Sequence, residues 1–342
     1  MSYIPFSDSD TIISSEAIVS ALWSNNTYTL GTSSLYTSST QEQSYTGDTY
    51  LNVYNLPATA SNAELQFALS YGHVSGSGSA PYNTSAPGLT PTSNIYTQCV
   101  NTIYGDETAP LAFGGVVSKD VYVINVARSR YKESIKPGSF NLVLKSPSGS
   151  VYLTDNSKDL TSANYVGGNR YYTVVSGSNG NSWNSTEVQT VSGSYGMFFP
   201  DLATVYLNPR ALSLPVSSGG ISSSIDETAS TSYTSPINTN NSKLFGYIYN
   251  GNNISGNSQE TVTSKYFAVN VKFNDCNYTT NPSVIDNNGN ILYTTLVDNP
   301  ETYVTGVGLY NELNELMGIA KLSKPLKKSF INTLSFKVKL ST

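Results

Sequence analysis

The feature that most constrains the fold of this chain is an apolar residue at every second position in several short stretches. The clearest case runs from Leu334 to Leu340, where Leu, Phe, Val and Leu alternate with Ser, Lys and Lys. The stretch from Leu65 to Tyr71 alternates in the same way. Successive side chains of a β-strand point to opposite faces of a sheet, so this period predicts half-buried strands. The core of the protein is therefore expected to be built from β-sheet.

Other stretches extend this prediction to buried strands and hairpins. Asp120 to Arg128 is nearly continuous in apolar and β-branched residues, which predicts a central strand buried on both faces. Elsewhere, turn residues separate pairs of apolar stretches, and Asn288-Gly289 favours the positive φ of a tight turn. Three hairpins are predicted on this basis, over residues 140–153, 284–293 and 302–322.

Helix is expected to be scarce. Thr92 and Ser93 are candidate caps of a short helix that ends at Tyr104, because apolar residues recur at helical spacing between them. One or two helical turns are predicted for 129–135, and residues 16–23 are a third, weaker candidate for a helix.

The fold class that follows is mainly β: an antiparallel β-sandwich with long polar loops and a few short helices. We expect residues 1–57 to form an N-terminal arm and 58–342 to form the sandwich body. Within the body, the polar stretch around 215–242 is expected to be a loop insertion, and 129–214 is a candidate subdomain. The stretch 75–91, rich in Gly, Pro and Ser, is also expected to be a loop.

Composition excludes several classes of protein. Charged residues are only 12% of the 342 residues, and the net charge is -5, so the basic excess of a nucleic-acid-binding protein is absent. No run of about 18 apolar residues is present, so no membrane span is expected. The first ten residues, MSYIPFSDSD, have neither a basic nor an apolar region, so no signal peptide is expected.

Few residues suit common enzyme or metal chemistry. Cys99 and Cys276 are too few for a zinc site and are expected to be reduced and structural. His73 is the single histidine, and no G-x-S-x-G, phosphate-loop or dinucleotide motif accompanies it, so we expect it to be structural. The segment Asp286–Asn290 lacks the spacing of a calcium loop. We therefore expect no catalytic, cofactor-binding or metal-binding residue.

Paired carboxylates leave a glycosidase as an alternative function, and exposed aromatics leave a sugar-binding module as another. A glycosidase needs two carboxylates on either side of the scissile bond, and Trp183 could form a platform for a sugar. The spacing does not show which carboxylates would converge, and we expect most of them to be surface and turn residues. The pairs considered are Asp106 with Glu107, Asp155 with Asp159, Asp298 with Glu301, and Glu312 with Glu315.

Basic residues gather in the last 22 residues, which contain no acid. They form a candidate surface for docking an acidic partner protein. Equally, lysines on a strand can protect an exposed edge against aggregation. The six lysines are Lys321, Lys324, Lys327, Lys328, Lys337 and Lys339. A second basic group comprises Lys119, Arg128, Arg130, Lys132, Lys136 and Lys145.

Four stretches together resemble a protein family. They are ELQFALSYGHVSGSGS at 64–79, VYVINVARSRYKESIKPGSFNLVL at 121–144, YGMFFPDLATVYLNPRAL at 195–212, and the long C-terminal block 277–340, which contains YVTGVGLYNELNELMGIAKLSKPLKKSF. In this order they resemble virion structural proteins of T4-like marine myophages, the cyanophages and their relatives. The resemblance implies a component of the contractile tail or baseplate that is assembled in the host cytoplasm and located in the virion. No catalytic residue is implied.

The leading hypothesis is thus a phage virion structural protein, in a baseplate wedge or tail, that acts through symmetric contacts. Its partners would be other virion proteins and further copies of itself, with no nucleic acid and no membrane. The low charge and abundant Tyr suit such interfaces. The alternatives are a head decoration or neck protein, a module that binds host glycans, and a glycan hydrolase.

Overall fold

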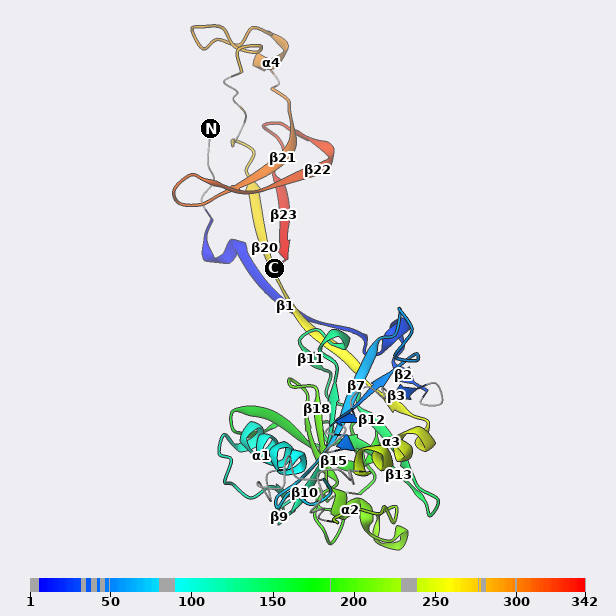
Figure 1. The fold of residues 1–342 in the computed structure, drawn as a ribbon. Helices are drawn as coiled ribbons and strands as arrows, with labels where there is room; N and C mark the ends of the chain where they lie inside the picture. The colour runs from blue at the N-terminus through cyan, green and yellow to red at the C-terminus, as the bar shows by residue number, and fades with distance from the viewer. Residues whose placement is uncertain are drawn as a thin grey trace. The chain divides into compact units, whose positions relative to one another are not determined.

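The computed structural model describes residues 6–31, 35–37, 42–43, 47–48, 50–79, 90–184, 186–228, 239–275, 277, 281–298 and 300–341. The chain divides into two compact units. One, which we call the sheet unit, is Ile18–Glu260. The other, which we call the terminal unit, combines Met1–Ala17 with Thr261–Thr342. Figure 1 labels the elements of both units.

These units differ from the predicted domains. The predicted arm, 1–57, is divided, because β2 (Thr29–Leu30) and β6 (Tyr50–Tyr54) pair with strands of the sheet unit. The candidate subdomain 129–214 is not separate, because its strands belong to the same sheet as 65–73. Pairing between strands that are distant in sequence thus sets these boundaries, and composition does not reveal it.

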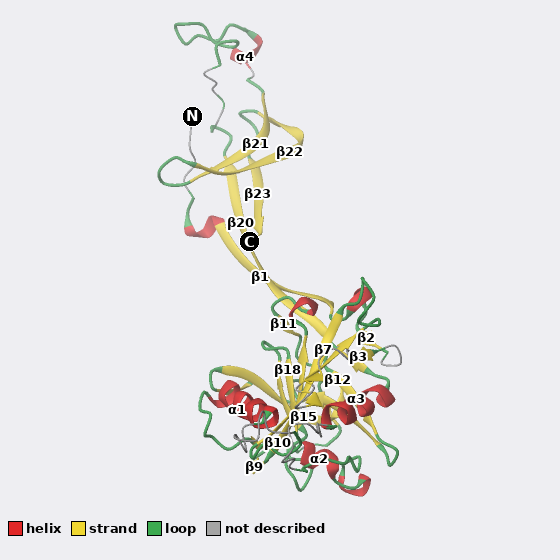
Figure 2. Cartoon of the chain, in the orientation of Figure 1, coloured by secondary structure: helices red, strands yellow, loops and turns green. Residues whose placement is uncertain are grey.

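One large antiparallel sheet dominates the sheet unit and confirms the mainly β fold class, with a sandwich-like curled sheet and few short helices (Figure 2). Its main path runs β2-β19-β12-β13-β15-β17-β18-β10-β7-β6-β3, and β14 and β16 pair with β15. The further strands are β3 (Tyr36–Thr37), β7 (Leu65–His73), β10 (Asp120–Val126), β12 (Asn141–Lys145), β13 (Ser150–Asp155), β14 (Asn164–Val166), β15 (Asn169–Ser178), β16 (Asn181–Ser182), β17 (Gly196–Phe199), β18 (Thr204–Leu207) and β19 (Ile254–Ser255). Two small pairs lie outside it: β4 (Glu42–Gln43) with β5 (Gly47–Asp48), and β8 (Ala112–Phe113) with β9 (Val116–Val117).

Both faces of this sheet are covered by apolar side chains. Strands β6, β7, β10, β12, β13, β15, β17 and β18 all contribute to one continuous core, which includes Phe67, Tyr122 and Leu142. Helix α3 (Asn240–Gly251) adds Leu244 and Ile248 to this core and contacts β12 as well as β7, which are distant in the sheet order. The helix therefore covers the face that the curled sheet encloses.

The second core lies on the opposite face, under helix α1 (Pro91–Tyr104). Alternate residues of β10, such as Val121 and Val123, pack there with Cys99 and Ile103 of the helix. The sequence predicted this helix, but its cap is Thr90, which forms a capping box with Ser93, and not Thr92. Pro91, at the first helical position, sets the start two residues earlier.

Several other predictions are confirmed. Strand β10 is buried on both faces except at Asn125. The hairpin over 140–153 is the β12–β13 pair, and that over 302–322 is β21 (Thr302–Tyr310) with β22 (Leu316–Lys328). The C-terminal alternation is β23 (Leu334–Ser341). The hairpin over 284–293 is reduced to a single bridge, Ile285 to Ile291.

Other predictions are wrong. Residues 16–23 were expected to be helical, but β1 (Thr11–Ala21) occupies most of them. Residues 129–135 contain only the 3-10 turn η5 (Arg128–Arg130) and the strand β11 (Ser134–Ile135). Strand β7 buries most of its predicted apolar positions, but Gln66 on the other face is also buried, with its amide oxygen accepting from the Ser24 backbone N–H. In each case tertiary pairing overrides a local pattern.

Three helices of the described residues, α2 (Pro209–Ser213), α3 and α4 (Thr295–Asp298), were not predicted. The predicted loop around 215–242 ends in the first turn of α3, and α2 follows the Asn208 cap. Short 3-10 turns are η1 (Asp8–Asp10), η2 (Ser24–Asn26) and η6 (Val216–Ser218). Residues 80–89 and 229–238 of the predicted loops, and Cys276, lie outside the described residues.

The terminal unit contains the β21–β22 hairpin, β23, α4 (Thr295–Asp298) and most of β20 (Asn257–Val271). A four-stranded sheet has the order β1-β20-β11, and β23 pairs with β20. Strands β1 and β20 begin in one unit and end in the other. The β21–β22 hairpin is a separate two-stranded sheet.

Candidate functional sites

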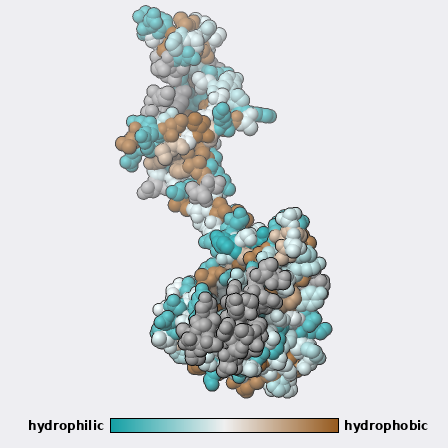
Figure 3. Space-filling view, in the orientation of Figure 1, coloured by the Kyte–Doolittle hydropathy of each residue, from teal (hydrophilic) through white to brown (hydrophobic). Residues whose placement is uncertain are grey.

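Exposed apolar side chains are concentrated in the terminal unit. Its buried apolar side chains, among the described residues, are Val271, Leu309, Phe336 and Val338. Many more are exposed, and hydrophobic residues gather over β21 and β22 in Figure 3. Met317 and Ile319, on the same face of β22, are 70% and 65% exposed. Others are Phe273, Tyr303, Leu313, Leu316, Leu326, Phe330 and Ile331.

The two strands of this hairpin differ in charge. Strand β21 carries no charged residue from Thr302 to Tyr310, whereas β22 carries four lysines and Pro325. The register jumps between Val304–Leu326 and Gly306–Lys321, so Pro325 lies in an irregular part of β22. Lysine, proline and irregularity are devices that keep a strand edge from pairing. The edge of β22 is thus protected, and that of β21 is not.

The six lysines predicted as a docking surface do not act as one group. Lys328 is fully buried, and its ammonium donates to the carbonyl oxygens of Phe273 and Ser329 and to Asn277 Oδ1 at 2.9–3.0 Å. Including Lys328 in an exposed surface was therefore wrong, because three oxygens solvate its charge inside the unit.

The remaining five lysines are exposed on two strands. Lys327 pairs with Glu301, and Lys321 and Lys324 lie on β22. Lys337 and Lys339, on β23, place their ammonium groups 4.2 Å and 5.8 Å from the centre of the Tyr266 ring. These two side chains lie over an aromatic ring of β20. This contact favours the interpretation that the lysines protect the strands against aggregation over the interpretation that they dock a partner.

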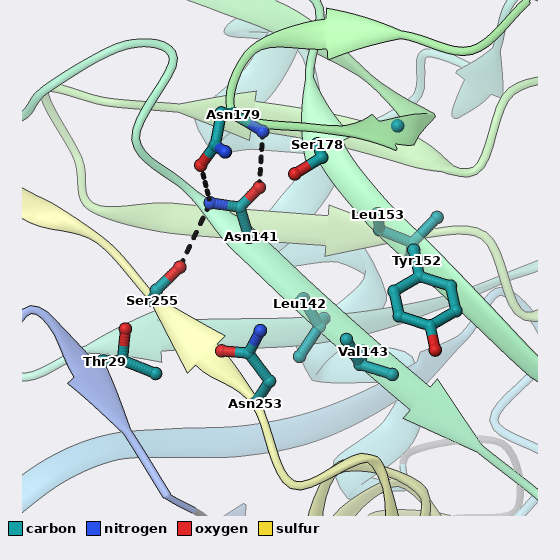
Figure 4. A pocket seen from close by; sticks show the side chains of 11 residues that line it. Thr29, Asn141, Leu142, Val143, Tyr152, Leu153, Ser178, Asn179, Asn253 and Ser255 are labelled. Atoms are coloured by element: carbon teal, nitrogen blue, oxygen red, sulfur yellow. Dashed lines mark hydrogen bonds between the residues drawn. The ribbon is translucent and has the colours of Figure 1, made fainter.

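A second candidate site is a hollow of about 230 Å³ in the sheet unit (Figure 4). It lies where β2, β19, β12, β13 and the end of β15 run side by side. Its lining contains amides, hydroxyls and apolar groups and no charged side chain: Thr29, Asn141, Leu142, Val143, Tyr152, Leu153, Gly177, Ser178, Asn179, Asn253 and Ser255.

Asn141 fixes the polar end of this hollow. Its Nδ2 donates to Asn179 Oδ1 and to Ser255 Oγ, both at 3.0 Å, and its Oδ1 accepts from the Asn179 backbone N–H at 2.6 Å (Figure 4). Asn179 holds a φ of 53° in the turn between β15 and β16, a conformation that asparagine tolerates. One amide therefore ties three segments together.

Asn253 supplies an unused acceptor. Its Oδ1 is buried, and no group in the described part of the chain forms a hydrogen bond with it. The residue follows the left-handed Asn252 that ends α3, and its carbonyl accepts from the Val143 backbone N–H at 3.0 Å. The backbone is thus fixed while the side chain keeps an unsatisfied oxygen at the hollow.

Aromatic rings stand beside the same hollow. Tyr152 lines it, and the Trp183 ring lies 5.7 Å from the Tyr152 ring, tilted by 47°. Trp183 is 63% exposed, whereas Trp23, the second tryptophan, is 3% exposed in the core. The Trp183 backbone N–H donates to the Ser176 carbonyl at 2.9 Å, which fixes the chain beneath the ring.

A wider, shallower hollow of about 450 Å³ shares Thr29, Asn141, Asn179 and Ser255 with the first. Lys136, Lys158 and Tyr28 line its far part. The two hollows therefore lie next to each other at this end of the sheet, and we refer to both together as the groove.

The carboxylate pairs considered from the sequence serve local structure. Asp155 is buried and accepts twice from the Gly138 N–H and once from the Ser157 N–H, and burial raises its pKa. Asp159 accepts from the Ser182 N–H at 2.7 Å. Asp106 accepts from Thr108, and Glu315 accepts from Asn311. Each of these carboxylates therefore stabilises a turn or a loop contact.

A buried ionic cluster was not predicted. Asp120 is fully buried, and Arg210 of α2 contacts both of its oxygens at 3.1 Å. Ser118 and Tyr71 donate their hydroxyls to the same carboxylate at 3.1 and 3.4 Å. Arg210 also pairs with Glu227. Burial raises the pKa of Asp120, and Arg210 opposes this shift. The cluster joins β10, β7 and α2 and is structural.

His73 is structural as well. Its Nδ1 accepts from the backbone N–H groups of Ser75 and Ser77 at 3.2 and 3.4 Å, so the ring is neutral with its proton on Nε2. Burial lowers the pKa of His73.

This arrangement predicts a loss of stability in mild acid. The unfolded chain binds a proton near pH 6.5, whereas the folded chain resists it, so stability falls as the pH drops below about 6.5. Linkage limits the slope from one group to about 1.4 kcal/mol per pH unit. Urea titrations between pH 7.5 and 5.5 should show this slope in the wild type and not in His73→Gln. An equal slope in both proteins would contradict it.

Among the described residues, no helix could span a membrane, and no cluster of three or more His, Cys, Asp or Glu side chains could hold a metal ion. Comparisons of the chain with protein-family models, with curated proteins and with solved structures each found no match.

Proposed function

We propose that this chain is a structural subunit of a phage virion, in the tail or baseplate, and that its terminal unit makes symmetric contacts with other copies and with neighbouring virion proteins. The observation that carries the proposal is the exposure of apolar side chains on the terminal unit. A soluble monomer rarely exposes a large contiguous apolar surface, and such surfaces mark sites of association.

The β21–β22 hairpin adds to this argument. An isolated two-stranded sheet is marginally stable in water and needs a further strand or a packed face. Strand β21 is uncharged along its whole length, so a second copy paired to its edge would bring no like charges together. On β22, the lysines would oppose each other in such a pair.

The sequence resemblance also supports the terminal unit as the surface for assembly. Its most specific block, 277–340, lies in the terminal unit and includes α4, β21, β22 and most of β23. The proposed assembly surface and the stretch most similar to virion proteins therefore coincide. A head decoration or neck protein remains the alternative location, because the contact surface does not depend on where in the particle the subunit lies.

Association is the first testable consequence. The full chain is expected to form oligomers in size-exclusion chromatography with light scattering. Met317→Lys with Ile319→Lys should raise the dissociation constant by at least about a hundredfold, because each of the two buried side chains is worth about 1.5–3 kcal/mol. Val191→Lys, at an 83% exposed position of the sheet unit, is the matched control and should change nothing.

Two results would contradict the proposal. One is a wild-type chain that stays monomeric at high concentration and does not bind virion subunits. The other is equal weakening by Val191→Lys. Quantitative mass spectrometry of separated heads and tails then assigns the location: a multiple of the tail symmetry in tails is expected, presence in heads supports the decoration alternative, and absence from particles overturns both.

A further inference from the structure

We propose that the groove across the end of the sheet in the sheet unit, centred on the hollow beside Tyr152 and Asn253, binds a neutral saccharide. This inference goes beyond the assembly role and involves different residues, so either can fail without the other. It rests on the lining of the hollow, its aromatic rim and its unused acceptor.

The lining selects for a neutral polyol. The hollow of about 230 Å³ contains three asparagines, hydroxyls from Thr29, Ser178 and Ser255, and no charged side chain. Asparagine side chains both donate and accept, as sugar hydroxyls do. Phosphates and carboxylates are usually held by cationic groups, which this part of the groove lacks.

The aromatic rim supplies the second element of sugar recognition. A pyranose has one face of C–H groups, and this face packs on an aromatic ring while the hydroxyls point outward from the ring edge. Trp183 and Tyr152 form such a pair beside the hollow, and both are exposed. Large exposed aromatics bury much area at low entropic cost when a ligand covers them.

Asn253 supplies the third element. A buried oxygen without a partner costs about 1–3 kcal/mol relative to one that is hydrogen-bonded. Asn141, by contrast, uses its amide for protein contacts on both sides. The Asn253 oxygen has almost no surface open to solvent, so a sugar hydroxyl donates to it only after the side chain turns toward the hollow. One saturated amide therefore shapes the hollow, and a second, unsatisfied amide gains a partner by turning toward a ligand.

The smaller hollow shares part of its lining with the wider one, so the ligand is expected to extend over both. Thr29, Asn141, Asn179 and Ser255 belong to both, and Tyr28, 53% exposed, lies at the far part. An oligosaccharide whose first unit packs on Trp183 could therefore continue toward Tyr28. A trisaccharide is expected to bind more tightly than the matching monosaccharide.

Tryptophan fluorescence can test saccharide binding specifically, because only one of the two tryptophans is exposed. The probes are neutral trisaccharides of glucose, galactose, mannose, rhamnose, N-acetylglucosamine and N-acetylgalactosamine, titrated into the full chain. Binding should change the tryptophan emission and protect it from acrylamide, because Trp183 is exposed and Trp23 is buried. Isothermal calorimetry then gives the affinity for each probe that binds.

Substitutions distinguish saccharide binding in the groove from nonspecific adhesion of the saccharide to the protein. Trp183→Ala should lower the affinity at least tenfold, and Asn253→Ala about fivefold to tenfold. Asn253→Ala removes an unsatisfied acceptor, so its fold should be retained, as circular dichroism can check. Tyr165→Ala, which removes a 70% exposed aromatic on β14 outside the groove lining, is the matched control and should leave the affinity unchanged.

Binding of at least one probe with this order of effects supports the proposal. Failure of all six probes at 20 mM to change emission or heat would overturn it, as would a loss of affinity in Tyr165→Ala equal to that in Trp183→Ala. Association through the terminal unit, measured on the same preparations, should be unaffected by Trp183→Ala.

Discussion

Replacing Gly251 with alanine is expected to destabilise the sheet unit by about 3 kcal/mol or more. Gly251 ends α3, and a Cβ at this position would come within 1.8 Å of the Val143 carbonyl oxygen and 2.6 Å of its carbon. Both contacts are with backbone, so neither can be relieved by a side-chain rotation. The helix would have to move away from β12, against which it packs.

Gly246, five residues earlier in the same helix, gives the matched control. A Cβ there would meet no atom within 4 Å, and alanine is the better helix former by about 1 kcal/mol. Gly246→Ala is therefore expected to stabilise the chain slightly. Urea unfolding followed by circular dichroism measures both variants. Equal effects of the two substitutions would show that the close approach of α3 to β12 does not govern stability.

Replacing Arg210 with methionine is expected to cost about 3 kcal/mol, because it leaves the Asp120 carboxylate buried without its cation. Methionine retains the length of the side chain and removes the charge. The free energy of unfolding should recover as the pH is lowered, since a buried acid with a raised pKa is stabilised by protonation and destabilised as the pH rises.

The double variant Asp120→Asn with Arg210→Met tests this explanation. Without the buried charge, most of the loss should disappear, and the pH dependence of the single variant should disappear with it. Denaturant titrations at pH 5 and pH 7.5 measure both effects. If the double variant is as unstable as Arg210→Met at both pH values, Arg210 stabilises the chain by packing and not by its charge.

Of these two contacts, only that of Gly251 lies beside the groove. Gly251 precedes Asn252 and Asn253, and it allows α3 to end against β12, which contributes Asn141 and Val143 to the hollow. The Asp120 cluster fixes β10 and β7, on the far side of the sheet order. Loss of saccharide binding in Gly251→Ala but not in Arg210→Met would separate local from global effects.

Several strands could be located from the sequence alone, because alternation or a continuous apolar stretch marks them. Strands β10, β12, β13, β21 and β23 follow from period and turn residues, because a strand must place apolar side chains on a buried face. The same local information located α1, since Ile95, Cys99 and Ile103 recur at helical spacing, although the predicted cap was two residues late. These features are local and need no knowledge of the partner strand.

Which segments pair with one another could not be predicted, because strand pairing depends on residues that are distant in the chain. β1 pairs with β20 although residues 16–23 were expected to be helical, and β2, β3 and β6 of the predicted arm join the large sheet. The hollow likewise brings Thr29, Asn141, Asn179 and Asn253 together from four distant segments. Trp183 alone was a candidate from sequence, because an exposed aromatic in a polar loop is visible without its neighbours. Asp120 with Arg210 was not, since a single carboxylate in an apolar strand acquires its meaning only from the cation that the fold places beside it.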